Sequence, residues 1–89
     1  MTSKGRILVV DDEPNARTAL AEILKEEGYQ VETAADGFKG LARAEEFGPD
    51  LVLTDLKMPG MDGVELLRKL RHHAADVPVV LMTAFGAVE

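Results

Sequence analysis

Short apolar runs alternate along this chain with longer amphipathic stretches, and this alternation limits the folds open to it. Three of the runs contain no polar residue, namely residues 7–10, 51–53 and 79–82. Unbroken apolar strands are typical of parallel sheets that helices cover on both faces. A fourth segment, residues 29–34, alternates apolar and polar side chains, which predicts a strand at the sheet edge with one wetter face.

Three stretches between these runs have the apolar spacing of amphipathic helices. The first covers residues 14–27 and the second residues 37–47, and Gly28 and Gly48 follow them as helix-terminating residues. A third begins after Asp62, which resembles a helix cap paired with Glu65, and should run to about residue 72. The apolar positions predicted to face the core are Ala16, Leu20, Ile23 and Leu24, then Phe38, Leu41, Ala42 and Ala44, then Val64, Leu67 and Leu70.

Right-handed crossovers leave few topologies for such an alternation. We expect an α/β fold with a flavodoxin-like, doubly wound parallel sheet of strand order 2-1-3-4. Ligands of these sheets bind at the switch point, in the crevice between the ends of the first and third strands. Asp11 and Asp12 directly follow the first strand, and the third runs out at Asp55. The topology therefore predicts that three carboxylates meet in this crevice.

Three carboxylates within a few ångströms repel one another unless a cation lies among them. An all-oxygen ligand set favours Mg²⁺, which binds one or two carboxylates, keeps several waters and accepts phosphate oxygens. Asp55 is then placed to act as a nucleophile on phosphorus. Thr83 ends the fourth strand at the same edge, where its hydroxyl and the amide of Ala84 can donate to a phosphoryl oxygen.

Each of these residues taken alone also has a purely structural explanation. Asp12 is well suited to cap the helix that begins near Pro14. Asp55 and Thr83 are ordinary strand-end and strand residues, and residues 58–63 have the Pro and Gly content of a simple loop. Their coincidence at one sheet edge is what favours a functional site.

The tandem His72 and His73 suggest a metal site or a phosphorelay histidine at first sight. Both fall near the end of the third predicted helix. Positive charge is favoured at that end of a helix, so we interpret the pair as structural.

Composition narrows the class of protein further. With 89 residues the chain has room for one domain, residues 1–89, and it contains no cysteine for disulfides or thiolate metal sites. Its formal charge of -6 disfavours direct contact with nucleic acids or anionic membranes. The first apolar run is too short for a signal peptide or a membrane span, so we expect a cytoplasmic protein.

Three motifs together resemble the response-regulator receiver domain: VVDDEP at 9–14, LTDLKMPGMDG at 53–63 and MTAFG at 82–86. The resemblance extends over essentially the whole chain. It implies that Asp55 is the phosphoacceptor, that Asp12 binds Mg²⁺ directly, and that Asp11 binds it largely through water. It further implies that Thr83 is the switch hydroxyl.

The resemblance also implies roles for backbone groups and partners. The carbonyl of Lys57 matches a metal ligand, and the amides of Lys57 and Ala84 match donors to the phosphoryl group. The phosphoryl donor would be a phosphohistidine on a sensor histidine kinase. The receiver would catalyse its own phosphorylation and dephosphorylation without being a conventional enzyme. The final residues, 82–89, are reminiscent of receivers fused to ATPase-driven transcription activators.

The chain departs from the family in ending at Glu89. The family's fifth strand, which bears a phosphate-binding lysine and a switch aromatic residue, and its fifth helix have no counterpart. Neither Lys57 nor Lys69 matches that lysine by position. We therefore expect a C-terminally truncated receiver in which phosphorylation survives and switching does not.

Two other function classes fit part of the pattern. A haloacid-dehalogenase-type phosphatase also uses an aspartate nucleophile and Mg²⁺, but it needs two aspartates separated by one residue, whereas Asp11 and Asp12 are adjacent. A noncatalytic, receiver-like interaction scaffold is the other alternative. Asp55→Asn separates it from a phosphoacceptor, because a scaffold would bind its partner unchanged.

An uncovered apolar fourth strand invites pairing with another chain. We predict that the 89-residue chain alone is destabilised, oligomeric or exchanges a segment with a neighbour. Size-exclusion chromatography tests this prediction, and a compact, stable monomer would contradict it.

Overall fold

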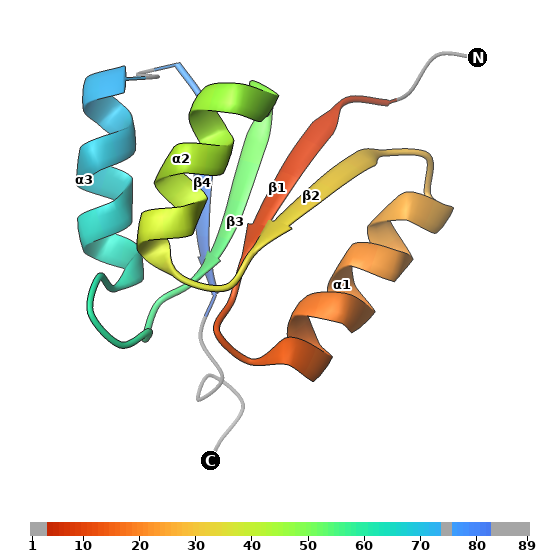
Figure 1. Ribbon diagram of the computed structural model, residues 1–89. Coiled ribbons are helices and arrows are strands. Elements are labelled where there is room, and N and C mark those ends of the chain that lie inside the picture. The colour runs from red at the N-terminus through yellow and green to blue at the C-terminus, as the bar shows by residue number, and fades with distance from the viewer. Residues whose placement is uncertain (1–3, 74–75, 83–89) are drawn as a thin grey trace.

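Four parallel strands form one sheet in the order β2-β1-β3-β4, which confirms the predicted topology (Figure 1). A computed structural model describes residues 4–73 and 76–82 of the chain. The strands are β1 (Arg6–Val10), β2 (Gln30–Ala34), β3 (Leu51–Asp55) and β4 (Val79–Met82). The helices are α1 (Pro14–Glu26), α2 (Gly37–Phe47) and α3 (Gly63–His73).

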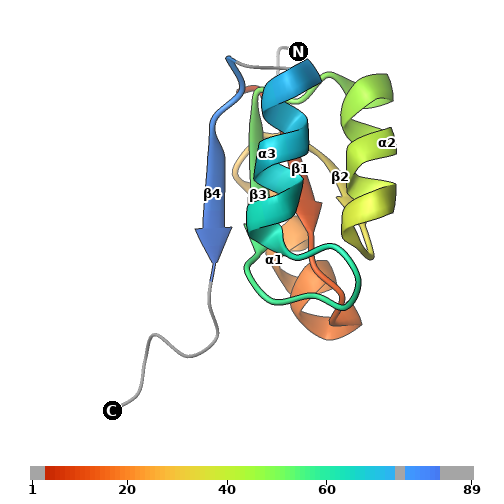
Figure 2. The ribbon, with the colours of Figure 1, turned by 90° about the vertical axis from the view of Figure 1, so that its left-hand side faces the viewer.

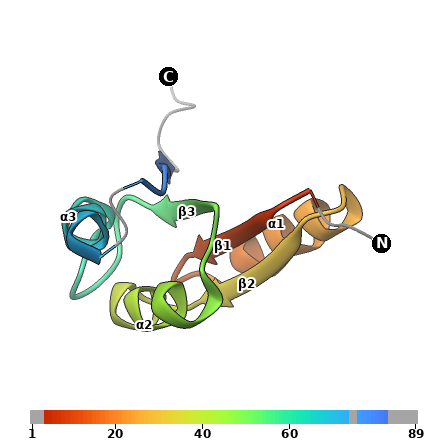
Figure 3. The ribbon, with the colours of Figure 1, turned by 90° about the horizontal axis from the view of Figure 1, so that it is seen from above.

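The helices lie on both faces of this sheet. Helix α1 covers one face beside β1 and β2, while α2 and α3 pack together on the opposite face (Figure 3). Strand β1 is covered on both sides, so four successive residues, 7–10, are buried. Strand β4 runs along the outer edge of the sheet (Figure 2), where Val80 and Leu81 are exposed.

The strand register brings the acidic residues to one edge. Val10 pairs with Ala34 on one side and with Thr54 on the other, so Asp11 leaves β1 beside the end of β3. Asp55 is the last residue of β3 and pairs with Met82 at the end of β4. The carboxyl ends of β1, β3 and β4 therefore share one edge, as a parallel sheet requires.

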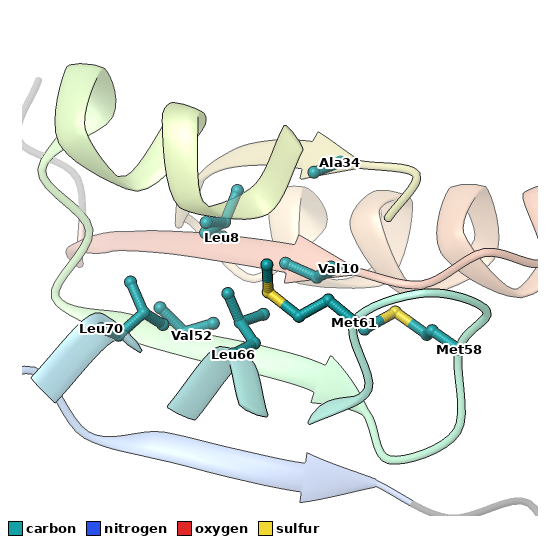
Figure 4. Packing of buried hydrophobic residues seen from close by; sticks show 8 residues of the cluster. All are labelled: Leu8, Val10, Ala34, Val52, Met58, Met61, Leu66 and Leu70. Atoms are coloured by element: carbon teal, nitrogen blue, oxygen red, sulfur yellow. The ribbon is translucent and has the colours of Figure 1, made fainter. Parts of the chain in front are cut away.

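The main hydrophobic cluster lies between the sheet and the α2–α3 layer (Figure 4). Leu8, Val10 and Val52 point into it from the strands. Met58 and Met61 enter from the loop between β3 and α3, and both are buried. Residues 58–62 do form a loop, and through these two methionines the loop also closes one end of the core.

Helix α3 buries one of its three predicted core residues, Leu70, but not the other two. Gly63, Leu66 and Leu70 are its buried residues, whereas Val64 is exposed and Leu67 is half-buried. The steps of three and four residues from Gly63 define a stripe that starts one position before the predicted one. A glycine carries no hydrophobic signal, so counting apolar residues began at Val64.

Four residues of α1 and α2 that were predicted to face the core lie on the surface instead, namely Ala16, Ile23, Phe38 and Ala42. Phe38 is 63% exposed at the start of α2, and Ile23 is 57% exposed on α1. In α2, Gly37 and Gly40 take the buried positions, because a Cβ at Gly37 would meet Met61 and one at Gly40 would meet Val10. Close approach of α2 to the core thus turns Phe38 outward.

The helix ends largely follow the predicted signals. Asp62 accepts a hydrogen bond from the amide of Glu65 at 2.9 Å, so it caps α3, and Gly48 ends α2 with φ of 65°. None of the helices in residues 4–73 and 76–82 combines the length and apolar character needed to span a membrane.

Gly63 generates a testable prediction about the junction of β3 and α3. A Cβ at this position would lie 2.5 Å from the carbonyl oxygen of Asp55 and 3.0 Å from Cα of Leu56, so only glycine allows this approach. We expect Gly63→Ala to lower the free energy of unfolding by about 1–3 kcal/mol in urea titrations. Lys69→Ala, an exposed change in the same helix, should stay within about 0.5 kcal/mol. Equal stability of the two variants would contradict this account.

Candidate metal centre

The carboxylates of Asp11, Asp12 and Asp55 come together at the carboxyl edge of the sheet. Each offers one oxygen, and these oxygens all lie within 4.8 Å of one another. They line a crevice of about 600 Å³, whose other walls include Pro14 and Leu20 of α1. The predicted convergence of these three side chains is confirmed.

The three carboxylates differ in their surroundings. Asp11 is only 9% exposed, Asp55 is half-buried and Asp12 is exposed. The amide of Asp11 donates to the carbonyl oxygen of Ala34 at 3.1 Å, which continues the β1–β2 pairing. Its carboxylate accepts a hydrogen bond from the amide of Glu13 at 2.9 Å. Asp11 is thus the fixed inner wall of the site, and Asp12 is its solvent-facing side.

Burial raises the pKa of the Asp11 carboxyl above its ordinary value of 3.8. The hydrogen bond from the Glu13 amide favours the charged form and opposes this rise. The negative charges of Asp55, Asp12 and Glu13 add to the rise. A cation bound among these groups would reverse the sign of this local field, since it favours the ionised carboxyl.

The donor set fits a hard divalent cation such as Mg²⁺. All three side chains supply oxygen, the ligand atom that this ion prefers. Two oxygens bound directly to one Mg²⁺ lie at most about 4.2 Å apart, given bond lengths of roughly 2.1 Å. The three carboxylate oxygens lie within 4.8 Å of one another, which is close to this range.

Asp55 lies where β3 ends and its backbone is held on both sides. The hydroxyl of Thr54 donates to the Asp55 carbonyl at 3.1 Å, and the next amide, of Leu56, donates to Met82 at 2.8 Å. The amide of Lys57 donates to Oδ1 of Asp55 over a long distance of 3.4 Å. The Lys57 backbone therefore lies beside the carboxylate. Thr83 and Ala84, also predicted site residues, lie outside the described residues.

Helix α1 is capped by a residue of the turn between β1 and α1. Glu13 is the cap, and its side chain accepts a hydrogen bond from the amide of Ala16 at 2.9 Å. The interpretation of Asp12 as the helix cap is therefore wrong. Glutamate is an unusual cap, so the shorter Asp12 was the natural sequence candidate. Asp12 instead stands among the carboxylates of the crevice.

Arg17 is a neighbour of the site that the sequence did not indicate. Its Nη1 donates to the backbone carbonyl oxygen of Asp11 at 2.8 Å. A charged residue on an amphipathic helix normally indicates only a solvated face, and no motif distinguishes Arg17 from other charged helix positions. Only the folded turn reveals its contact.

The tandem histidines lie in the last turn of α3, as expected for the end of a helix. Nδ1 of His73 is 4.0 Å from Oε2 of Glu45 on α2, and both side chains are exposed. Within the described part of the chain, the group of three possible metal ligands is the acidic one, to which neither histidine belongs.

Comparison with known proteins adds an independent finding. The family model for the response regulator receiver domain matches residues 7–89. Sporulation initiation phosphotransferase F of Bacillus subtilis is 42% identical over 84 residues, which are 94% of this chain and 68% of that protein. Regulatory protein AtoC of Escherichia coli is 42% identical over the whole chain, which spans only 19% of AtoC.

The solved structures include a receiver with ligands at its site. The response regulator TrrA of Thermotoga maritima, in complex with Mg²⁺ and BeF, superimposes with a TM-score of 0.85 at 44% identity. The match covers 91% of this chain and 70% of that one. The receiver fold predicted from the sequence is confirmed.

The raised pKa of Asp11 predicts how the metal-free protein responds to pH. A carboxyl whose pKa is raised by folding contributes stability that is fully present below its ordinary pKa of 3.8 and is lost as the pH rises through the raised value. Asp11→Asn removes this charge and can still accept from the Glu13 amide. In EDTA, we expect the variant to melt at a higher temperature than the wild type at neutral pH. This advantage should shrink toward pH 3.8, and an unchanged melting temperature at neutral pH would contradict the account.

Proposed function

Because this chain belongs to the response regulator receiver domain family, we propose that it accepts a phosphoryl group on Asp55 in a Mg²⁺-dependent reaction. The family acts in two-component signalling, and receiver domains bind Mg²⁺ at an acidic pocket. The observation that supports the proposal most strongly is the convergence of Asp11, Asp12 and Asp55 within 4.8 Å. A phosphoacceptor needs such a cluster, in which one carboxylate attacks and the others hold the cation.

The proposed roles of the carboxylates are those that the family resemblance implies. Asp12, which is exposed, binds the cation directly, and Asp11, which is buried, contacts it largely through water, as the resemblance implies. The bound Mg²⁺ would offset the negative charge that accumulates as phosphorus approaches. The Lys57 backbone contributes its carbonyl to the cation and its amide to the phosphoryl group, as its place beside Asp55 allows.

The proposed chemistry is a single phosphoryl transfer. An Oδ atom of Asp55 attacks phosphorus, an O–P bond forms, and the N–P bond of a phosphohistidine breaks. The histidine nitrogen retains the electron pair of the broken bond. The imidazole leaves neutral when its other nitrogen carries a proton, and otherwise it gains a proton from solvent as it leaves. Hydrolysis of the acyl phosphate by water later restores Asp55. Thr83 and Ala84 complete the proposal as donors to the phosphoryl oxygens.

The proposed phosphoryl donor is a sensor histidine kinase, and the proposed setting is the cytoplasm. The chain spans about a fifth of AtoC, so an output domain, of the ATPase-driven activator type, is a proposal for the whole protein. The formal charge of -6 supports a role in transcription through such a partner rather than by direct contact with nucleic acid. Exposed Val80 and Leu81 on edge strand β4 support pairing with another chain as part of the proposal.

Phosphorylation by a small-molecule donor tests the proposal without the kinase. We expect the chain to gain one phosphoryl group from phosphoramidate in Mg²⁺, as seen by intact-mass spectrometry, and to gain none in EDTA. Asp55→Asn should abolish the gain, because its amide is not a nucleophile toward phosphorus.

Asp36→Asn is the matched control for this experiment. Asp36 caps α2 through a hydrogen bond to the amide of Lys39, and asparagine caps a helix equally well. Its phosphorylation should equal that of the wild type. Labelling that persists in Asp55→Asn would overturn the assignment of the phosphoacceptor.

A further inference from the structure

Arg17 makes a contact at the acidic site that has no part in the proposed phosphoryl transfer. It lies in the second turn of α1, and its side chain reaches back over the first turn, the direction that helical side chains favour. There its Nη1 donates to the carbonyl oxygen of Asp11 at 2.8 Å. Arg17 is half-buried, whereas most of its neighbours in the first turns of α1 are exposed.

The carbonyl that Arg17 holds belongs to the peptide between Asp11 and Asp12. The rest of Asp11 is already fixed, since its amide donates to Ala34 and its carboxylate accepts from Glu13. The chain that follows this peptide carries both Asp12 and the Glu13 amide, so a rotation that turned Asp12 away would displace the Asp11 carbonyl and stretch the Glu13 hydrogen bond. The hydrogen bond from Arg17 opposes this rotation together with the one from the Glu13 amide, and it is the one that holds the carbonyl itself.

Asp12 depends on its backbone more than Asp11 does. Its side chain is exposed, so packing does little to fix its direction. The Asp12 side chain also does not fix the turn by capping helix α1, because Glu13 is the capping residue. The direction of the Asp12 carboxylate is therefore set by the peptide that precedes it.

We propose that Arg17 is a positioning residue for the metal centre: by holding the Asp11 carbonyl, it keeps the Asp12 carboxylate directed at the cation. This inference rests on the proposed function, since it concerns affinity for Mg²⁺. Arg17 acts on the backbone of the ligands and does not touch the ion or the phosphoryl group. Contacts that orient metal ligands in this way are typically worth 10- to 100-fold in metal affinity.

Charge and positioning predict opposite effects of removing Arg17. The guanidinium is a positive charge beside a cation site, so on Coulombic grounds alone its loss would strengthen Mg²⁺ binding. If Arg17 positions the ligands, its loss weakens binding. The sign of the change in affinity therefore separates the two roles.

The experiment is a Mg²⁺ titration of the ¹⁵N-labelled 89-residue chain, followed by amide NMR, for the wild type and three variants. We expect Arg17→Ala to weaken binding about tenfold or more. Arg17→Lys keeps the charge but lacks the planar fork, and should fall between the wild type and Arg17→Ala. Arg43→Ala is the matched control, because Arg43 pairs with Glu32 on the surface and its loss removes the same charge.

A second readout does not depend on the metal. In EDTA, Arg17→Ala should shift the amide signals of Asp12 and Glu13, while Arg43→Ala should leave them in place. Should Arg17→Ala fail to fold, Arg17→Lys decides the question by the same two measurements.

The outcomes separate this inference from the proposed function. If the wild type binds Mg²⁺ and the Arg17 variants bind it equally well or more tightly, the positioning role is overturned and the metal site stands. If the wild type itself binds no Mg²⁺, the proposed function fails, and the positioning role fails with it.

Discussion

The main electrostatic constraint on this structure is the mutual repulsion of three carboxylates at one sheet edge. The parallel register places Asp11 and Asp55 on neighbouring strand ends, and Asp12 follows Asp11 directly. Burial is the largest cause of the raised pKa of Asp11, and the negative charges of Asp55 and Asp12 raise this pKa further. The fold thus holds together charges that a cation would stabilise, which is the condition that a phosphoacceptor needs before it can accept more negative charge.

The sheet and its order were predictable because they follow from hydrophobic periodicity and handedness. Three apolar runs and one alternating segment located the four strands, and right-handed crossovers gave the order β2-β1-β3-β4. The helix faces were less predictable, because glycines determine them. Gly37, Gly40 and Gly63 are buried where a side chain would collide with Met61, Val10 or the Asp55 backbone. A glycine shows no hydrophobicity in the sequence, so Phe38 and Val64 were wrongly expected to be buried.

The acidic triad was predictable for a different reason. A carboxylate at the end of a parallel strand has its position fixed by topology, whatever its rotamer, so Asp11, Asp12 and Asp55 could be brought together from the sequence alone. The contacts that hold them were not predictable. The cap at Glu13 and the hydrogen bond from Arg17 to the Asp11 carbonyl depend on the exact path of one turn. Spacing in the sequence does not determine such a path.

The proposed function requires that these three carboxylates form one working cation and phosphoryl site in this chain. Amide NMR spectra in Mg²⁺, before and after addition of beryllium fluoride as a stand-in for the phosphoryl group, test it most directly. We expect the amide signals of Asp11, Asp12, Asp55 and Lys57 to shift most, because these residues surround the crevice or lie beside it. A well-dispersed spectrum that does not respond to either addition would contradict the proposed function.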